Sequence, residues 1–122
     1  MTRMSPTRRR TPTGDALNLV REERMAQDGK WGEQNWPDAL SQCNYPSPGA
    51  LAARAITDGR AQDGSLSYTD ILLEEVAEAV DEARASALGV RGSKGRLKTE
   101  LIQVAAVAVA WFEKLNREES LV

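Results

Sequence analysis

Two stretches of the chain decide its fold: ILLEEVAEAVDEA at residues 71–83 and LKTELIQVAAVAVAWF at residues 97–112. In the first, apolar residues recur every three or four positions, which predicts a helix with one buried side that Ser67 or Thr69 can cap. The opposite side carries three acidic residues, Glu75, Glu78 and Glu82. In the second stretch no charged residue follows Glu100. Because a helix that is apolar all round is normally buried, we expect this second helix to be covered on all sides.

The sequence before these stretches predicts two further helices. The first covers about residues 15–28, with Thr13 or Asp15 as its cap and Gly29 as its stop. The second covers about residues 48–61 and follows a loop whose three prolines prevent regular structure.

A glycine-rich basic connector, GVRGSKGRLK at residues 89–98, joins the two deciding stretches. The helix that follows it covers about residues 97–116, and no part of the chain alternates with the period of a strand. We therefore predict an all-α fold of four helices. They form a single domain over residues 14–122, after a disordered basic tail at residues 1–13.

The composition excludes several classes of function. The chain of 122 residues has a net charge of −2 with acids and bases interleaved, which gives no general case for binding nucleic acid or a membrane surface. Because there is no histidine, carboxylates or a metal must carry any catalysis. The single cysteine, Cys43, cannot form an internal disulfide. With no signal peptide and no apolar span of bilayer length, we expect a cytoplasmic protein.

Glu100 gives the strongest reason to expect a metal. Taken alone, the acidic side of residues 71–83 is typical of a solvated helix face. Glu100 instead opens an apolar helix, and a buried carboxylate needs a partner. Antiparallel packing of the two helices would bring Glu75 and Glu78 to Glu100. Hard cations relieve the repulsion among crowded carboxylates, so we expect Mg²⁺, or Mn²⁺, at these three residues.

The motifs EEVAE at residues 74–78 and ELIQ at residues 100–103 resemble the EExxE and ExxD signature of the MazG-like nucleoside triphosphate pyrophosphohydrolases. KWGEQN at residues 30–35 also resembles small bacterial and phage members of that family. The resemblance implies a four-helix MazG-like bundle and Mg²⁺-dependent hydrolysis of an NTP or dNTP to the monophosphate and pyrophosphate, for nucleotide-pool clearance. It implies that Mg²⁺ is bound by Glu75, Glu78, Glu100 and Gln103. It also implies that the catalytic residues are Glu74, Glu75, Glu78 and Glu100, with Glu74 as an accessory acid. Because the last helix is too apolar for a thin monomer, we expect a homo-oligomer, a dimer or a tetramer.

Gln103 departs from the family signature, which has aspartate at this position. An amide oxygen can coordinate a metal, but it brings no negative charge. The alternative is that Gln103 only hydrogen-bonds within a helix interface. The departure leaves open a second function, a module that binds a nucleotide or an alarmone without hydrolysing it. A third possible function is that of a helical interaction protein, in which the acidic residues face solvent or pair with basic side chains.

Candidate substrate contacts lie outside the acidic motifs. The segment WGEQNWPD at residues 31–38 combines indoles, which can stack on a base, with amides, which can bind its edge. The resemblance implies that the nucleobase pocket includes Trp31, Gln34, Asn35 and Trp36. The alternative is that the two tryptophans fill core space around a loop. The basic candidates for phosphate binding are Lys30, Arg54, Arg60 and Lys94.

Overall fold

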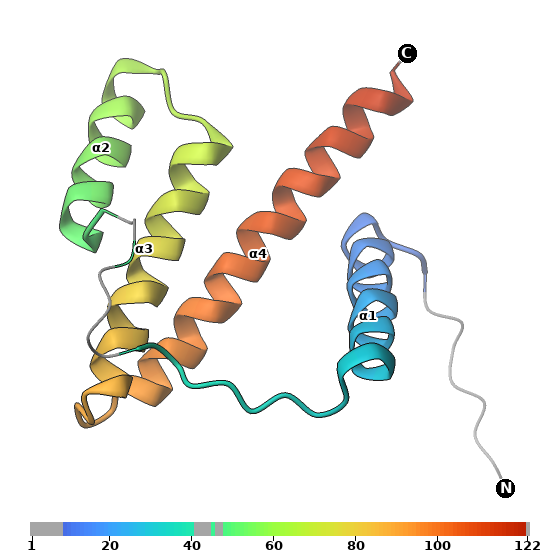
Figure 1. Cartoon of the computed structure of the whole chain (residues 1–122). Helices are drawn as coiled ribbons and strands as arrows, with labels where there is room; N and C mark the ends of the chain where they lie inside the picture. Colours follow the sequence, from blue (N-terminus) through green and yellow to red (C-terminus); the bar gives the residue numbers. More distant parts are fainter. Residues whose placement is uncertain (1–8, 41–44, 46–47, 122) are drawn as a thin grey trace, which may run out of the picture. The chain divides into compact units, whose positions relative to one another are not determined.

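A computed structural model of the chain describes residues 9–40, 45 and 48–121. Within these ranges every regular element is an α-helix (Figure 1). The helices are α1 (Pro12–Trp31), α2 (Ala50–Asp63), α3 (Tyr68–Ala87) and α4 (Ser93–Ser120). The prediction of an all-α fold with four helices is confirmed. None of these helices is long and apolar enough to cross a membrane.

Helix α3 begins at a capping box, which confirms Ser67 as its cap. The Ser67 hydroxyl accepts a hydrogen bond from the backbone N–H of Asp70, and the Asp70 carboxylate accepts one from the backbone N–H of Ser67. The two bonds satisfy donors that a helix start otherwise leaves without a partner. Helix α2 begins and ends two residues later than the predicted range of 48–61, and Gly64 caps its end in the left-handed conformation.

Both predicted ends of the first helix are wrong. Helix α1 begins at Pro12, and the hydroxyl of Thr11 caps it by accepting a hydrogen bond of 2.9 Å from the backbone N–H of Gly14. Gly29 lies inside the helix, which continues to Trp31 and ends at Gly32. A glycine within a helix costs only about 1 kcal/mol, so it does not by itself end one. Two residues of the predicted tail, Pro12 and Thr13, thus belong to α1, whereas residues 1–8 and Cys43 lie outside the described residues.

The connector between α3 and α4 is shorter than its glycine content predicts. Helix α4 already begins at Ser93, so only residues 88–92 form the turn. Gly89 and Gly92 have φ angles of 76° and 81°, which favour glycine. Ser93 is fully buried, and its hydroxyl donates a hydrogen bond of 2.6 Å to the carbonyl of Val90. This bond fixes the start of α4 against the turn.

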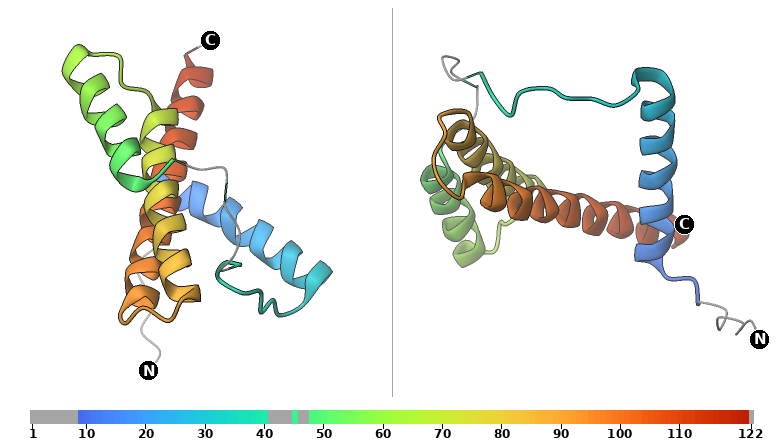
Figure 2. Two further views of the ribbon diagram at one scale, coloured as in Figure 1. Left: turned by 60° about the vertical axis from the view of Figure 1, so that its left-hand side comes forward. Right: turned by 90° about the horizontal axis from the view of Figure 1, so that it is seen from below.

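The structure divides into two compact units. Unit 1 comprises the described parts of residues 1–34 and 112–122, and unit 2 comprises those of residues 35–111. In unit 1, the Thr13 hydroxyl of α1 donates a hydrogen bond of 3.0 Å to the Glu113 carboxylate of α4. In unit 2, α2 packs antiparallel against α3, and α3 and α4 form an antiparallel hairpin (Figures 1 and 2). Unit 2 therefore places both acidic motifs on one hairpin.

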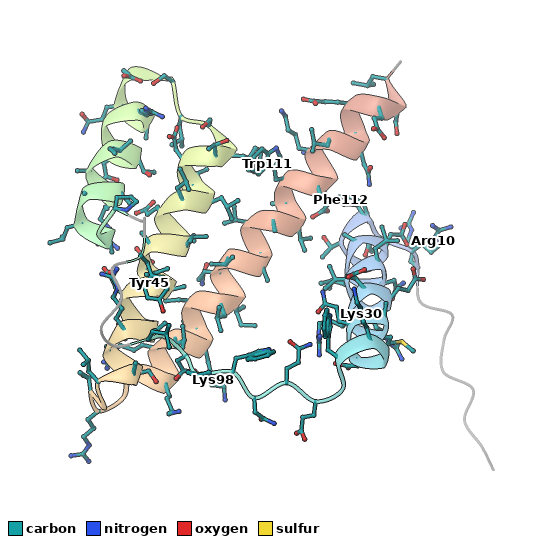
Figure 3. All side chains as sticks on the ribbon, viewed as in Figure 1. Arg10, Lys30, Tyr45, Lys98, Trp111 and Phe112 are labelled. Carbon is teal, nitrogen blue, oxygen red and sulfur yellow. The ribbon has the colours of Figure 1, made fainter. Side chains whose placement is uncertain are left out.

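The chain buries few hydrophobic side chains of its own. In the part that the structure describes, the buried hydrophobic residues are all alanines, namely Ala16, Ala53, Ala77 and Ala79. The prediction that residues 104–112 are covered on all sides is wrong for the single chain, because these residues are half-buried or exposed. Trp111 in this run stacks on Tyr68 of α3, with ring centroids 5.8 Å apart (Figure 3). Within unit 2, α3 covers α4 from one side, and one neighbouring helix cannot cover the rest.

Candidate metal centre

Three glutamates from α3 and α4 converge within unit 2. Glu75 and Glu78 lie one turn apart on α3, where residues three apart share a face. Glu100 lies at the start of the third turn of α4 and faces them across the hairpin. One carboxylate oxygen of each residue lies within 4.8 Å of the other two, and all three residues are half-buried. The structure thus brings together the three glutamates that the sequence assigned to one site.

Two oxygens of this three-glutamate cluster are buried without a hydrogen-bond partner in the described structure. They are Oε2 of Glu75 and Oε2 of Glu100. A buried carboxylate oxygen that gives up water without gaining a donor or a cation raises the free energy of the folded state. The cluster is therefore unfavourable as it stands, and a cation would relieve it.

The pKa values of the cluster record the same shortage of partners. The pKa of Glu100 is raised to about 7 by the loss of solvent, by a hydrogen bond with Glu78 and by the charges of Glu78, Glu75 and Glu82. The pKa of Glu75 is raised as well, first by the loss of solvent and then by the charges of Glu78 and Glu74. Repulsion among neighbouring carboxylates and desolvation both disfavour the ionised form. At neutral pH Glu100 of the metal-free protein is therefore close to half-protonated.

The spacing of the cluster suits a small divalent cation. Mg²⁺ holds its oxygen ligands at about 2.0–2.1 Å, so that two ligands on opposite sides lie about 4.2 Å apart. One oxygen of each of the three carboxylates lies within 4.8 Å of the other two, so the side chains would have to move closer together to bind one ion. Carboxylates are also the ligand type that hard divalent cations prefer.

Arg54 of α2 is a basic residue that pairs directly with a glutamate of the cluster. Its Nη2 lies 3.1 Å from Oε1 of Glu78, and its Nε lies 3.5 Å from Oε1 of Glu74. Glu74, the predicted accessory acid, is thus an ion-pair partner of Arg54. The guanidinium links α2 to two acids of α3, one inside the cluster and one outside it.

An open pocket of about 290 Å³ adjoins the cluster within unit 2. Its lining combines the start of α2 with acidic residues of the hairpin, and it consists of Ala50, Leu51, Arg54, Glu78, Asp81, Glu82 and Glu100. The pocket gives a ligand access to two of the three clustered glutamates and to Arg54. Its charges are mixed, so an anionic ligand would need a cation beside the carboxylates.

Two pocket residues, Asp81 and Glu82, were missing from the sequence-based site. The Asp81 carboxylate accepts a hydrogen bond of 3.0 Å from the backbone N–H of Ala50, which ties the start of α2 to α3. Glu82 accepts hydrogen bonds of 3.1 Å at both carboxylate oxygens from Nε of Arg96. The signal for Glu82 was present, because it continues the face of Glu75 and Glu78 by one more turn.

Gln103 is exposed on α4. It lies one turn after Glu100 on the same helix. The two buried carboxylate oxygens without a partner belong to Glu75 and Glu100, so they give no evidence for Gln103 as a ligand. Ligation by Gln103 stays a prediction.

Two of the predicted phosphate-binding residues of unit 2 are held by acids outside the cluster. Arg60 pairs with the buried carboxylate of Asp70. Lys94, which is highly exposed, lies 3.6 Å from the Asp38 carboxylate. That carboxylate also accepts a hydrogen bond from the Ser86 hydroxyl, which is the main reason why the pKa of Asp38 is lowered. Of the four candidates, Arg54 is the one that contacts a glutamate of the cluster.

The predicted nucleobase residues are divided between the two units. Trp31 and Gln34 line an open pocket of about 420 Å³ in unit 1, next to Lys30, whose Nζ lies 4.7 Å from the centroid of the Trp31 ring (Figure 3). Asn35 and Trp36 belong to unit 2. Trp31 and Trp36 are 62% and 77% exposed, so the alternative that they fill core space is wrong. Their contact with a base stays a prediction.

Comparisons with protein-family models, with curated protein sequences and with solved structures found no significant match to this chain.

Proposed function

We propose that this chain hydrolyses a nucleoside triphosphate to the monophosphate and pyrophosphate, with Mg²⁺ held by Glu75, Glu78 and Glu100. One observation carries the proposal: in the described part of the chain, Oε2 of Glu75 and Oε2 of Glu100 are buried without a hydrogen-bond partner and lie beside a third carboxylate. A hard divalent cation would satisfy both oxygens and neutralise their mutual repulsion. The resemblance of EEVAE and ELIQ to the MazG-like signature supports the same ligands and supplies the substrate class.

The chemistry asks little of the protein beyond charge and position. Water adds to the α-phosphorus while the bond to the oxygen bridging the α- and β-phosphorus atoms breaks, and pyrophosphate leaves. When bound, Mg²⁺ supplies charge neutralisation for the triphosphate and activation of the attacking water. Glu75, Glu78 and Glu100 fix the position of that charge, and Arg54 lines the wall of the pocket where phosphate groups would lie. A nucleophilic side chain is unnecessary, which suits a chain without histidine.

We also propose that the protein works as a homo-oligomer. Its support is the small core, in which alanines are the buried hydrophobic residues, together with large exposed side chains such as Ile102 and Phe112 on α4. An apolar groove of about 370 Å³ lies between α3 and α4, lined mainly by valines, alanines and leucines. Apolar surface of this kind is normally covered by a partner. Analytical ultracentrifugation at micromolar concentration tests this, and a stable monomer would contradict it.

A second candidate function, nucleotide or alarmone binding without hydrolysis, is favoured by one observation. The position where the MazG-like signature has aspartate carries a neutral and exposed amide, Gln103. On this alternative, calorimetry detects nucleotide binding but long incubation with Mg²⁺ or Mn²⁺ gives no product. Gln103→Asp then separates the cases, because a gain of turnover identifies a weakened catalytic site.

The deciding experiment is a screen of ribo- and deoxyribonucleoside triphosphates with identification of the products, in Mg²⁺ and in EDTA. Release of pyrophosphate and monophosphate that requires Mg²⁺ and disappears in Glu100→Gln is the expected result. Glu118→Gln is the matched control, since Glu118 lies on the same helix and pairs with Lys114, away from the cluster. Equal activity in the wild type and Glu100→Gln would remove the proposed metal site.

A further inference from the structure

Arg54 and a divalent cation would compete for the same carboxylate. Glu78 accepts a hydrogen bond of 3.1 Å from Nη2 of Arg54, and it is also one of the three clustered glutamates. Arg54 is 61% exposed at its side chain, whereas the side chain of Glu78 is 20% exposed. An exposed ion pair of this kind holds its partners weakly. A divalent cation on Glu78 would therefore repel the guanidinium and take its place.

Glu74 gives Arg54 a second partner that lies outside the cluster. It lies 3.5 Å from Nε of Arg54, its side chain is 15% exposed, and it is not one of the three clustered glutamates. The two acids thus hold different nitrogens of one guanidinium. If Glu78 is withdrawn, Nε stays with Glu74 while Nη2 loses its partner. That nitrogen belongs to a residue lining the same pocket as Glu78 and Glu100.

We propose that Arg54 is an exchangeable counter-ion, which neutralises Glu78 in the metal-free protein and becomes the phosphate-binding group of the pocket once a divalent cation occupies Glu78. The inference rests on the proposed function and adds an order of binding, with the cation before the phosphate-bearing ligand. A guanidinium suits the second role because its planar fork matches phosphate oxygens. Arg60 and Arg96 are not released in this way by a cation on Glu78, since they pair with Asp70 and Glu82, which lie outside the cluster.

The test uses calorimetry on the full chain with two probes, Mg²⁺ alone and inorganic pyrophosphate at saturating Mg²⁺. For Arg54→Ala we expect Mg²⁺ to bind about two- to fivefold more tightly than in the wild type, because an exposed ion pair no longer competes. We expect pyrophosphate to bind at least about tenfold more weakly, because a charge-assisted contact is lost. Arg54→Lys keeps the charge but not the fork, so its Mg²⁺ affinity stays near that of the wild type while pyrophosphate binding is intermediate.

Arg96→Ala is the matched control, because it removes an equal charge from a pocket acid outside the cluster. Arg96→Ala should not show the combination of tighter Mg²⁺ binding and weaker pyrophosphate binding that we expect of Arg54→Ala. The inference is overturned if Arg54→Ala binds Mg²⁺ no more tightly than the wild type, or if it binds pyrophosphate as tightly as the wild type does. Arg54 then only holds α2 against α3, and the proposed function stands. If the wild type binds no Mg²⁺ at all, both are overturned. Circular dichroism of each variant shows that the helices are intact.

Discussion

Helix α3 carries two acidic sites that each face an arginine of α2, and their electrostatics are opposite. Near the start of the helix, Asp70 is buried and pairs with Arg60. Its carboxylate also accepts hydrogen bonds of 2.8 and 3.1 Å from the hydroxyl and the backbone N–H of Ser67. The Ser67 hydroxyl is the main reason why the pKa of Asp70 is lowered, with Arg60 adding to it. This carboxylate is most stable when it is ionised.

Farther along α3, Glu75 and Glu78 meet Glu100 with too few donors. Arg54 serves Glu78, but buried oxygens of Glu75 and Glu100 have no hydrogen-bond partner in the described ranges. The pKa of Glu100 is raised to about 7, mainly by the loss of solvent. The two sites differ in the supply of donors and in the number of neighbouring carboxylates. A satisfied carboxylate stabilises a fold, whereas an unsatisfied cluster is a place for a ligand.

The largest expected effect separates the two sites by activity. Glu100→Gln should reduce Mg²⁺-dependent triphosphate hydrolysis by more than the roughly 10–100-fold that losing an outer partner of a metal ligand costs, because on the proposed function Glu100 binds the metal directly. Asp70→Asn should keep most of the activity per folded molecule. Initial rates of pyrophosphate release, normalised to the folded fraction, measure both. Equal losses in the two variants would mean that the sites do not differ in function.

The second effect separates the sites by stability. Ser67→Ala removes the capping hydroxyl, which costs about 1 kcal/mol and lowers the Tm by roughly 4 °C for a chain of 122 residues. Glu100→Gln should leave the Tm of the metal-free protein unchanged or raise it, because a carboxylate without partners is replaced by a neutral amide. Thermal unfolding followed by circular dichroism in EDTA measures both. A marked fall of Tm in Glu100→Gln would show that the cluster is structural.

The two sites also differ in how much of each could be predicted from the sequence. Helix α3 and its cap were predicted because the capping residue and the apolar spacing are local signals. The meeting of Glu75, Glu78 and Glu100 was predicted from the spacing on α3 and from a connector that allows antiparallel packing. Arg54 was only one of several basic candidates, because the sequence does not show which face of α2 lies against α3.

Coverage of α4 was the part that the sequence could not predict. An apolar run such as residues 104–112 states that something must cover it, but not whether the cover comes from the same chain. In the single chain several of these residues are exposed. The prediction of the end of α1 was wrong for a different reason. Gly29 and Gly32 are both possible stops, and the free energy gained by the helical turn between them decides which one ends the helix. Local signals thus predicted helix existence better than helix ends or cover.

The third effect uses the metal itself. Mg²⁺ at about three times its Kd should stabilise the wild type by about 0.8 kcal/mol, since a ligand bound only to the native state adds RT ln(1 + [L]/Kd). The affinity should fall as the pH drops below about 7, because the ion must displace the proton that Glu100 holds. Glu100→Gln should show neither effect, while Asp70→Asn should show both. Calorimetry and Tm measurements from pH 6 to pH 8 test this, and a pH-independent affinity would exclude Glu100 as a ligand.

The smallest effect is the pH dependence of the metal-free protein, in which the two sites have opposite signs. Glu100 has a folded-state pKa of about 7, above its ordinary value of 4.5, so its contribution lowers stability progressively as the pH rises from 4.5 to 7. Asp70 has a lowered pKa, so its stabilisation is complete above its ordinary value of 3.8 and is lost only as the pH falls through the folded-state value. Of the two sites, only the three-glutamate cluster, in which the pKa values of Glu100 and Glu75 are both raised, changes its contribution to stability between pH 5 and pH 8. We therefore expect the difference in Tm between Glu100→Gln and the wild type to grow over this interval, and the difference for Asp70→Asn to stay constant. Because the cluster adjoins an open pocket, screening by solvent keeps the growth small. If the Asp70→Asn difference changed instead, the assignment of charged and uncharged carboxylates along α3 would have to be reversed.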